Sequence, residues 1–187
     1  MGQYYKVIAK NATGTTIYDR SVENEYTLAK LCEHGYWDND FCRAVAESIV
    51  DKPTRICWVG DYATKEECEN LGFSYDAIWP EKGKNEEQTV HQTNFKLNSM
   101  RYLVNASKKQ IVDLKEYKKN HSSIERIFNP ITMLTCLGNG RGSGDYYPTK
   151  ESTANLVGSW AFDEIYLTNN LPEGGYEFIQ PIFFERR

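Results

Sequence analysis

The chain has 187 residues, a net charge of −4, 26% charged residues and 13% aromatic residues, which is typical of one folded, water-soluble domain. The acidic balance argues against a surface built mainly to bind nucleic acid. The N-terminus MGQYYKVIAK lacks an apolar signal core and no run of about 18 apolar residues occurs, so we expect neither secretion nor a membrane span.

The cysteines and histidines narrow the class of protein further. An odd number of cysteines without a C-x-x-C pair is typical of free thiols in a reducing compartment, so we predict a cytoplasmic protein. The histidines are isolated from one another and from metal-binding spacings, so we expect no metal site and no cofactor. The residues concerned are Cys32, Cys42, Cys57, Cys68 and Cys136, and His34, His91 and His121.

The first third of the chain predicts a hairpin followed by two helices. Residues 3–21 carry strand formers on both sides of an Asn–Thr–Gly turn. Residues 26–35 have helical apolar spacing. Residues 38–53 are the clearest helix, because the apolar positions follow a helical period between a cap at Asp38 to Asp40 and a terminating proline.

A buried strand and a capped helix are expected next. RICWVG at 55–60 is a short apolar run typical of a buried strand. TKEECENLG at 64–72 predicts a helix with a capping box formed by Thr64 and Glu67. Residues 80–95 show no periodicity and predict a mobile loop within a single domain that spans 1–187.

The second half reads mainly as strands. RYLVN at 101–105 and QIVDL at 110–114 predict a second hairpin, and ITMLTC at 131–136 predicts another buried strand. SWAFDEIYL at 159–167 and YEFIQPIFFE at 176–185 are aromatic-rich and strand-like. The element order therefore predicts an α+β fold, with a largely antiparallel sheet and two or three short helices in the N-terminal half.

Charge is distributed unevenly along the chain. Residues 61–87 carry eight acids and three lysines, a net charge of −5, whereas residues 96–126 carry eight bases and three acids, a net charge of +5. The simplest interpretation is a solvated acidic loop beside a solvated basic one.

The run LGNGRGSGDYY at 137–147 raises the main functional question. It fits neither the Walker loop, because no lysine stands at the required position, nor the dinucleotide fingerprint, because extended chain rather than a helix follows. Glycine-rich backbone N–H groups can nevertheless form an anion-binding nest, Arg141 offers a fork of donors for phosphate, and Asp145 offers acceptors for a ribose or a base edge. The alternative is a glycine hairpin whose Arg–Asp pair is only a surface ion pair.

The aromatic side chains of Tyr146, Tyr147 and Trp160 could hold a base by stacking. No motif for nucleophilic catalysis occurs, so we assign no catalytic residue. The candidate ligand-binding residues are Asp61, Tyr62, Asn139, Gly140, Arg141, Gly142, Gly144, Asp145, Tyr146 and Trp160.

Five stretches together resemble a family of uncharacterised bacterial and phage proteins. Members open with MGQYY and carry GNGRGGGD followed by VG-[ST]-WA-x-D-x-I. The resemblance covers essentially the whole chain, although Ser143 stands where the family has a glycine. It implies no defined activity, but its motifs are glycine and polar residues, which favours a ligand loop. The stretches are MGQYYK (1–6), WVGDYA (58–63), YLVNASKKQIVD (102–113), LGNGRGSGDYY (137–147) and VGSWAFDEI (157–165).

The leading hypothesis is a phage-type cytoplasmic protein that binds a phosphorylated, nucleotide-like small molecule and sequesters a host immune signal. We expect no membrane or nucleic-acid partner, and a homo-oligomer whose pockets lie between subunits. One alternative is an enzyme that cleaves such a nucleotide, with Asp145 or Asp163 as general base. The other is a protein–protein inhibitor of a host defence protein.

Overall fold

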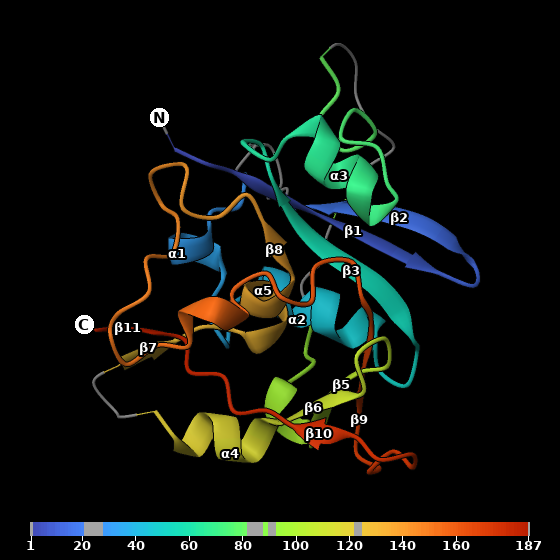
Figure 1. The fold of residues 1–187 in the computed structure, drawn as a ribbon, viewed down its shortest axis with the longest axis vertical. Coiled ribbons are helices and arrows are strands. Elements are labelled where there is room, and N and C mark those ends of the chain that lie inside the picture. Colours follow the sequence, from blue (N-terminus) through green and yellow to red (C-terminus); the bar gives the residue numbers. More distant parts are fainter. Residues whose placement is uncertain (1, 21–27, 82–87, 90–92, 122–124, 187) are drawn as a thin grey trace.

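The structure is a computed structural model that describes residues 2–20, 28–81, 88–89, 93–121 and 125–186 (Figure 1). Residues 82–87 and 90–92 of the predicted mobile loop lie outside the described residues. The main sheet has the strand order β10-β6-β5-β9-β3-β1-β2-β4, with β8 also paired to β3. Its strands are β1 (Tyr5–Asn11), β2 (Gly14–Asp19), β3 (Thr54–Gly60), β4 (Gln88–Thr89), β5 (Tyr102–Asn105), β6 (Gln110–Asp113), β8 (Cys136–Leu137), β9 (Glu164–Thr168) and β10 (Glu177–Phe178).

The longer strand pairs are all antiparallel, and the α+β class is confirmed. A second, two-stranded antiparallel sheet joins β7 (Glu125–Ile127) to β11 (Phe184–Arg186). The helices are α1 (Leu31–His34), α2 (Asp40–Ser48), α3 (Lys65–Leu71), α4 (Leu114–Lys119) and α5 (Pro130–Thr135), with 3₁₀ turns η1 (Leu97–Ser99) and η2 (Ala154–Leu156). The prediction that the helices lie in the N-terminal half is wrong, because α4 and α5 lie in the second half of the chain.

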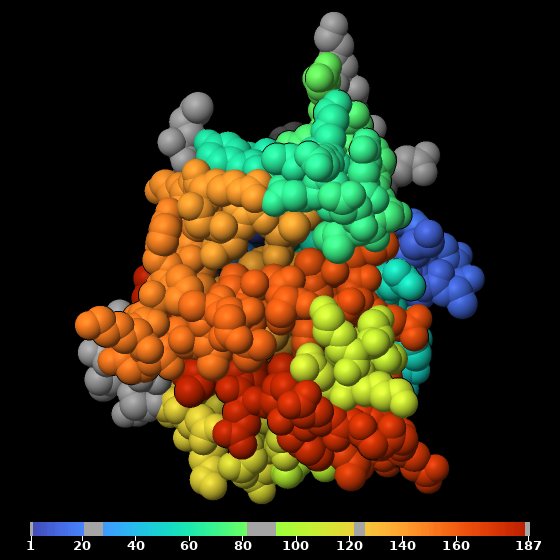
Figure 2. Space-filling view, in the orientation of Figure 1, coloured from blue at the N-terminus to red at the C-terminus, as the bar shows by residue number. Residues whose placement is uncertain are grey.

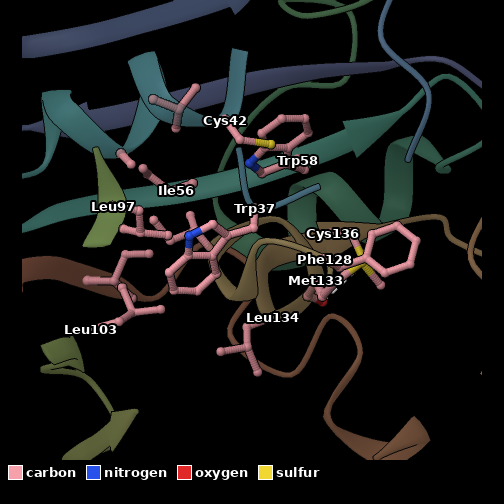
Figure 3. Close-up of a cluster of buried hydrophobic side chains, with 14 of the residues drawn as sticks. Trp37, Cys42, Ile56, Trp58, Leu97, Leu103, Phe128, Met133, Leu134 and Cys136 are labelled. Atoms are coloured by element: carbon pink, nitrogen blue, oxygen red, sulfur yellow. Dashed lines mark hydrogen bonds between the residues drawn. The ribbon is translucent and has the colours of Figure 1, made fainter. Parts of the chain in front are cut away.

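Both faces of the central strands are buried. Along β3, Ile56 and Trp58 belong to the larger apolar cluster, whereas Cys57 and Val59 belong to a smaller one, as the two-residue period of a strand requires. α2 and α5 cover the first face and α3 covers the other (Figure 1). Figure 3 shows part of the larger cluster, where side chains of β3, α5 and the segment before α2 meet. This double burial explains the continuous apolar run of β3.

The predicted hairpins, β3 and the two capped helices are confirmed. The side chain of Asn39 caps α2 by accepting from the amide of Phe41 at 3.0 Å. At α3 the predicted capping box is present, with Thr64 and Glu67 each accepting a backbone N–H of the other. None of the helices in the described part of the chain is long and apolar enough to span a membrane.

The predicted strand at 131–136 is wrong, because Pro130–Thr135 forms α5 instead. Asn129 caps this helix by accepting from the amide of Ile131, and Pro130 takes the first helical position, where its missing N–H costs nothing. Every residue of α5 is buried, so the segment shows no polar face and no helical period. A short apolar run of this kind cannot be assigned to helix or strand by periodicity alone.

Candidate functional site

The glycine loop, which we define as residues 138–145, binds an anion that the protein itself supplies. Asp145 is 3% exposed, and its Oδ2 accepts from the amides of Gly140, Arg141 and Gly142 at 2.8, 2.8 and 2.9 Å. Its Oδ1 accepts from the hydroxyl of Tyr5 at 2.8 Å. The predicted nest therefore exists, but the carboxylate of Asp145 occupies it where a ligand phosphate was expected.

Tyr5 acts as a permanent donor in this network. Burial, followed by the nearby Cys136 and Asp145, raises the pKa of its phenol far above the usual range, so the hydroxyl keeps its proton. Tyr5 itself is fully buried on β1. The contact thus ties the start of the chain to a loop 140 positions away.

The bare backbone of the loop makes room for Gln3. A Cβ added to Gly142 would lie 2.5 Å from Cβ of Gln3, and one added to Gly138 or Gly60 would lie 2.9 or 2.0 Å from its Nε2. The amide of Gln3 also donates to the carbonyl of Ser143 at 3.0 Å. The close approach of Gln3 to the backbone at these positions therefore accounts for the glycines.

Arg141 is paired with α3 rather than with Asp145. Its guanidinium donates to both carboxylate oxygens of Glu67, at 2.8 Å for the Nη1–Oε2 contact, and to the carbonyl of Tyr62 at 2.8 Å. Figure 2 shows the orange segment that contains the loop lying against the blue-green segment that contains α3. Arg141 thus joins two surface segments, and its fork of donors is already engaged.

This ion pair predicts an acid-dependent loss of stability. The hydrogen bond from Arg141 outweighs the opposing effect of burial and, with the capping hydrogen bonds of Thr64, lowers the pKa of Glu67 from 4.5 to about 2. A carboxyl whose pKa is depressed on folding stabilises the protein above its unfolded pKa, and that stabilisation is lost as the pH falls towards 2. Because both side chains are partly exposed, we expect Glu67→Gln to cost only about 1 kcal/mol at neutral pH.

Urea unfolding of the wild type and Glu67→Gln between pH 7 and pH 2 checks this expectation. The glutamine keeps an acceptor for the capping box, and its stability should fall less steeply below pH 4.5. Glu66→Gln, on the exposed side of the same helix, serves as the control and should follow the wild type. If the free energy of unfolding falls equally steeply below pH 4.5 in all three proteins, the role assigned to the ion pair is wrong.

Of the three aromatic residues expected to stack a base, Trp160 and Tyr146 offer no free ring face in this structure, whereas Tyr147 is exposed. Trp160 is fully buried, and its indole N–H donates to Oε1 of Gln110 at 2.8 Å. Tyr146 is 2% exposed, and its ring packs edge-on against Phe128. Both rings belong to the core, which corrects the stacking roles expected of them.

The remaining predicted site residues also make internal contacts. The Asn139 side chain pairs in both directions with the backbone of Tyr146, at 2.9 Å each way. Asp61 accepts from the amide of Tyr4 at 3.0 Å, and burial raises the pKa of its carboxyl. Gly144 has φ +85°, so glycine is required there for the turn itself. The structure therefore gathers most of the predicted residues around the loop, but through contacts within the protein.

A groove beside α4 has the features expected of a binding site. It is an open groove with a volume of about 520 Å³, within the range of small-molecule sites. It lies away from the glycine loop. In Figure 1, α4 is at the bottom of the view, whereas α3, which Arg141 of the loop contacts, is at the top. Apolar side chains, three neutral polar ones and four cations line it: Trp37, Met100 and Leu114; Asn98, Ser99 and Asn169; and Arg101, Lys115, Lys118 and Lys119. We call it the basic groove.

The second hairpin brings the two sides of the basic groove together. β5 and β6 pair antiparallel, with Tyr102 opposite Asp113, so Arg101 and Leu114 lie side by side where the strands meet the groove. The amide of Leu114 donates to the carbonyl of Arg101 at 2.9 Å. Asp113 then caps α4, because its Oδ1 accepts from the first amides of the helix. The turn from β6 into α4 thereby brings the lysines of α4 into the lining of the groove.

Side-chain contacts fix the position of Trp37 at the floor of the groove. The indole N–H of Trp37 donates to Oδ1 of Asn98 at 3.1 Å, and its ring stacks on Tyr117 with a centroid distance of 5.8 Å. Nζ of Lys118 contacts the same Asn98 oxygen at 3.1 Å and lies 5.6 Å from the Trp37 ring. Asn98 therefore positions both the indole and one ammonium group.

The groove is positively charged because only part of its cations are neutralised. Arg101 pairs with Asp113 at 2.5 Å, and Lys119 pairs with Glu116 at 3.4 Å. In the described part of the chain, Lys115 and Lys118 have no carboxylate partner. Two ammonium groups are thus available to an anion.

The charge excess of residues 96–126 was a usable sequence signal for this groove, although it was interpreted there as a solvated loop. The contribution of Trp37 had no local signal, because the fold brings it from a distant segment. Across the residues that the structure describes, no three His, Cys, Asp or Glu side chains form a group that could hold a metal ion. Comparison of the chain with family models, with curated proteins and with solved structures finds no match in any of the three.

Proposed function

We propose that this protein binds a phosphorylated, nucleotide-like small molecule and that the basic groove is the binding site. The observation that carries the proposal is a concave, apolar-floored groove whose rim holds four cations, two of them without a carboxylate partner among the described residues. Phosphate is the common biological group that such a rim recognises, and the floor suits the less polar part of a ligand. The neutral Asn98, Ser99 and Asn169 supply hydrogen-bonding groups for a sugar or base edge.

Binding without turnover fits the lining of the groove. Of the described residues that line it, none is a carboxylate, histidine or cysteine that could act as general base or nucleophile. The alternative of a nucleotide-cleaving enzyme assigned Asp145 as a general base. In the glycine loop, however, the carboxylate of Asp145 accepts four hydrogen bonds from the protein itself. Sequestration of a signalling nucleotide is the role that we propose for such binding.

The proposal predicts a charge-specific loss of affinity in Lys118→Gln. This change removes a positioned ammonium group from the rim, and we expect the affinity for a phosphorylated ligand to fall about tenfold, or about 1.4 kcal/mol. Isothermal titration with cyclic dinucleotides, ADP-ribose and NAD, preceded by native mass spectrometry of the purified protein for a retained nucleotide, measures it.

Lys10→Gln is the matched control, because Lys10 is an exposed lysine of β1 and the change in net charge is the same. It should bind as the wild type does, and both variants should keep the wild-type melting temperature. Equal affinities of the two variants would remove the basic groove from the binding site.

A further inference from the structure

The lysines of α4 form a row rather than a single contact. Lys115, Lys118 and Lys119 stand at positions i, i+3 and i+4 of the helix, so their side chains leave the same face. One turn of helix separates the ends of the row, about 6 Å along the axis. All three line the groove.

Like charges spaced in this way repel one another, and the protein relieves only part of the repulsion. Glu116 reaches Lys119, and Asn98 contacts Lys118 through a neutral oxygen. A single phosphate can contact two neighbouring lysines of the row, but four cations line the groove. A ligand with two linked phosphates can contact more of these cations at once, and each additional contact is charge-assisted.

Arg101, the residue before β5, adds a cation from outside α4. Its guanidinium is held by Asp113 and lies 5.6 Å from the ring of Tyr102. The Trp37 ring, in contrast, has Tyr117 on it and Lys118 near it and is 4% exposed, so a ligand base cannot stack on it fully. The arrangement recognises charge more than aromatic surface.

From this we infer that the ligand of the basic groove carries at least two linked phosphate groups, and that the number of phosphates sets its affinity more than the identity of its base. The inference rests on the proposed function. It places a diphosphate or dinucleotide along the α4 row and its neutral part against Asn98, Ser99 and Asn169.

A phosphate-number series tests it. Adenosine, AMP, ADP, GDP and inorganic pyrophosphate are titrated into the wild type, Lys115→Gln and the control Lys10→Gln, in buffer with EDTA. For the wild type, ADP should bind about tenfold more tightly than AMP, and GDP should lie within about threefold of ADP. Lys115→Gln should reduce the ADP advantage over AMP to less than about threefold, whereas Lys10→Gln should keep it.

The possible failures are distinguishable. Equal affinities of AMP and ADP for the wild type, or an ADP advantage unchanged in Lys115→Gln, would overturn the inference while leaving the groove as a site for a monophosphate. A difference of more than about tenfold between ADP and GDP would overturn the claim that charge dominates. Absence of binding by any member of the series would overturn both the inference and the proposed function.

Discussion

Replacing Asp145 with alanine should lower the free energy of unfolding by about 3–5 kcal/mol, among the largest effects available to one substitution in this chain. The change leaves three loop amides and the hydroxyl of Tyr5 without their common acceptor. The amide of Gly142 and the hydroxyl of Tyr5 make buried hydrogen bonds, and each buried donor that loses its partner costs about 1–3 kcal/mol. The amides of Gly140 and Arg141 belong to exposed residues, so water recovers most of their loss. Urea unfolding followed by tryptophan fluorescence measures the difference.

Two further variants separate the carboxylate from the rest of the network. Asp145→Asn keeps one oxygen for the loop amides and turns its amino group towards Tyr5, whose hydroxyl can accept, so it should cost roughly half as much as alanine. Tyr5→Phe removes a single hydrogen bond and should cost about 1 kcal/mol. If the free energy of unfolding of Asp145→Ala is within about 1 kcal/mol of that of the wild type, water in the variant replaces Asp145 as acceptor for the loop amides at little cost. The network would then not stabilise the fold as proposed.

Gly142→Ala should cost about 2–3 kcal/mol through steric overlap. The new Cβ would lie 2.5 Å from Cβ and 2.9 Å from the backbone nitrogen of Gln3, which a single side-chain rotation cannot relieve. Gly140→Ala is the matched control within the same loop. No atom lies within 4 Å of its added Cβ, so only the positive φ of +89° is penalised, by about 1 kcal/mol.

The same pair of variants distinguishes a structural loop from a ligand loop. We expect Gly140→Ala to leave the affinity for phosphorylated ligands unchanged, because the basic groove lies elsewhere. A larger stability loss in Gly140→Ala than in Gly142→Ala would show that backbone strain, and not contact with Gln3, accounts for the glycines. A loss of ligand binding in Gly140→Ala would indicate that the ligand binds at the glycine loop and not in the basic groove.

Local signals in the sequence predicted the elements whose structure is decided locally. The caps of α2 and α3, the turn of the first hairpin and the apolar run of β3 each carry their cause within a few residues. α5 was misassigned because all its side chains are buried, which removes the periodicity that distinguishes helix from strand. Its Asn–Pro start was the available signal.

The glycine loop and the basic groove could not be derived in the same way. Glycine and aspartate in the loop fit an anion-binding nest, but the occupant depends on Tyr5 and Gln3, which only the tertiary structure brings there. The basic groove forms only where Trp37, η1 and α4, which are far apart in the sequence, come together in the fold. Charge composition indicates that such a groove is possible, whereas its location depends on the fold.

Hydrogen–deuterium exchange with and without saturating ADP tests the central claim most directly, because it reports where the ligand acts without altering the protein. The account predicts slower exchange of the amides at 97–101 and 114–119, which flank the basic groove, and unchanged exchange at 138–145. Protection of residues 138–145 with no change at 114–119 would place the ligand at the glycine loop and contradict the assignment of the basic groove.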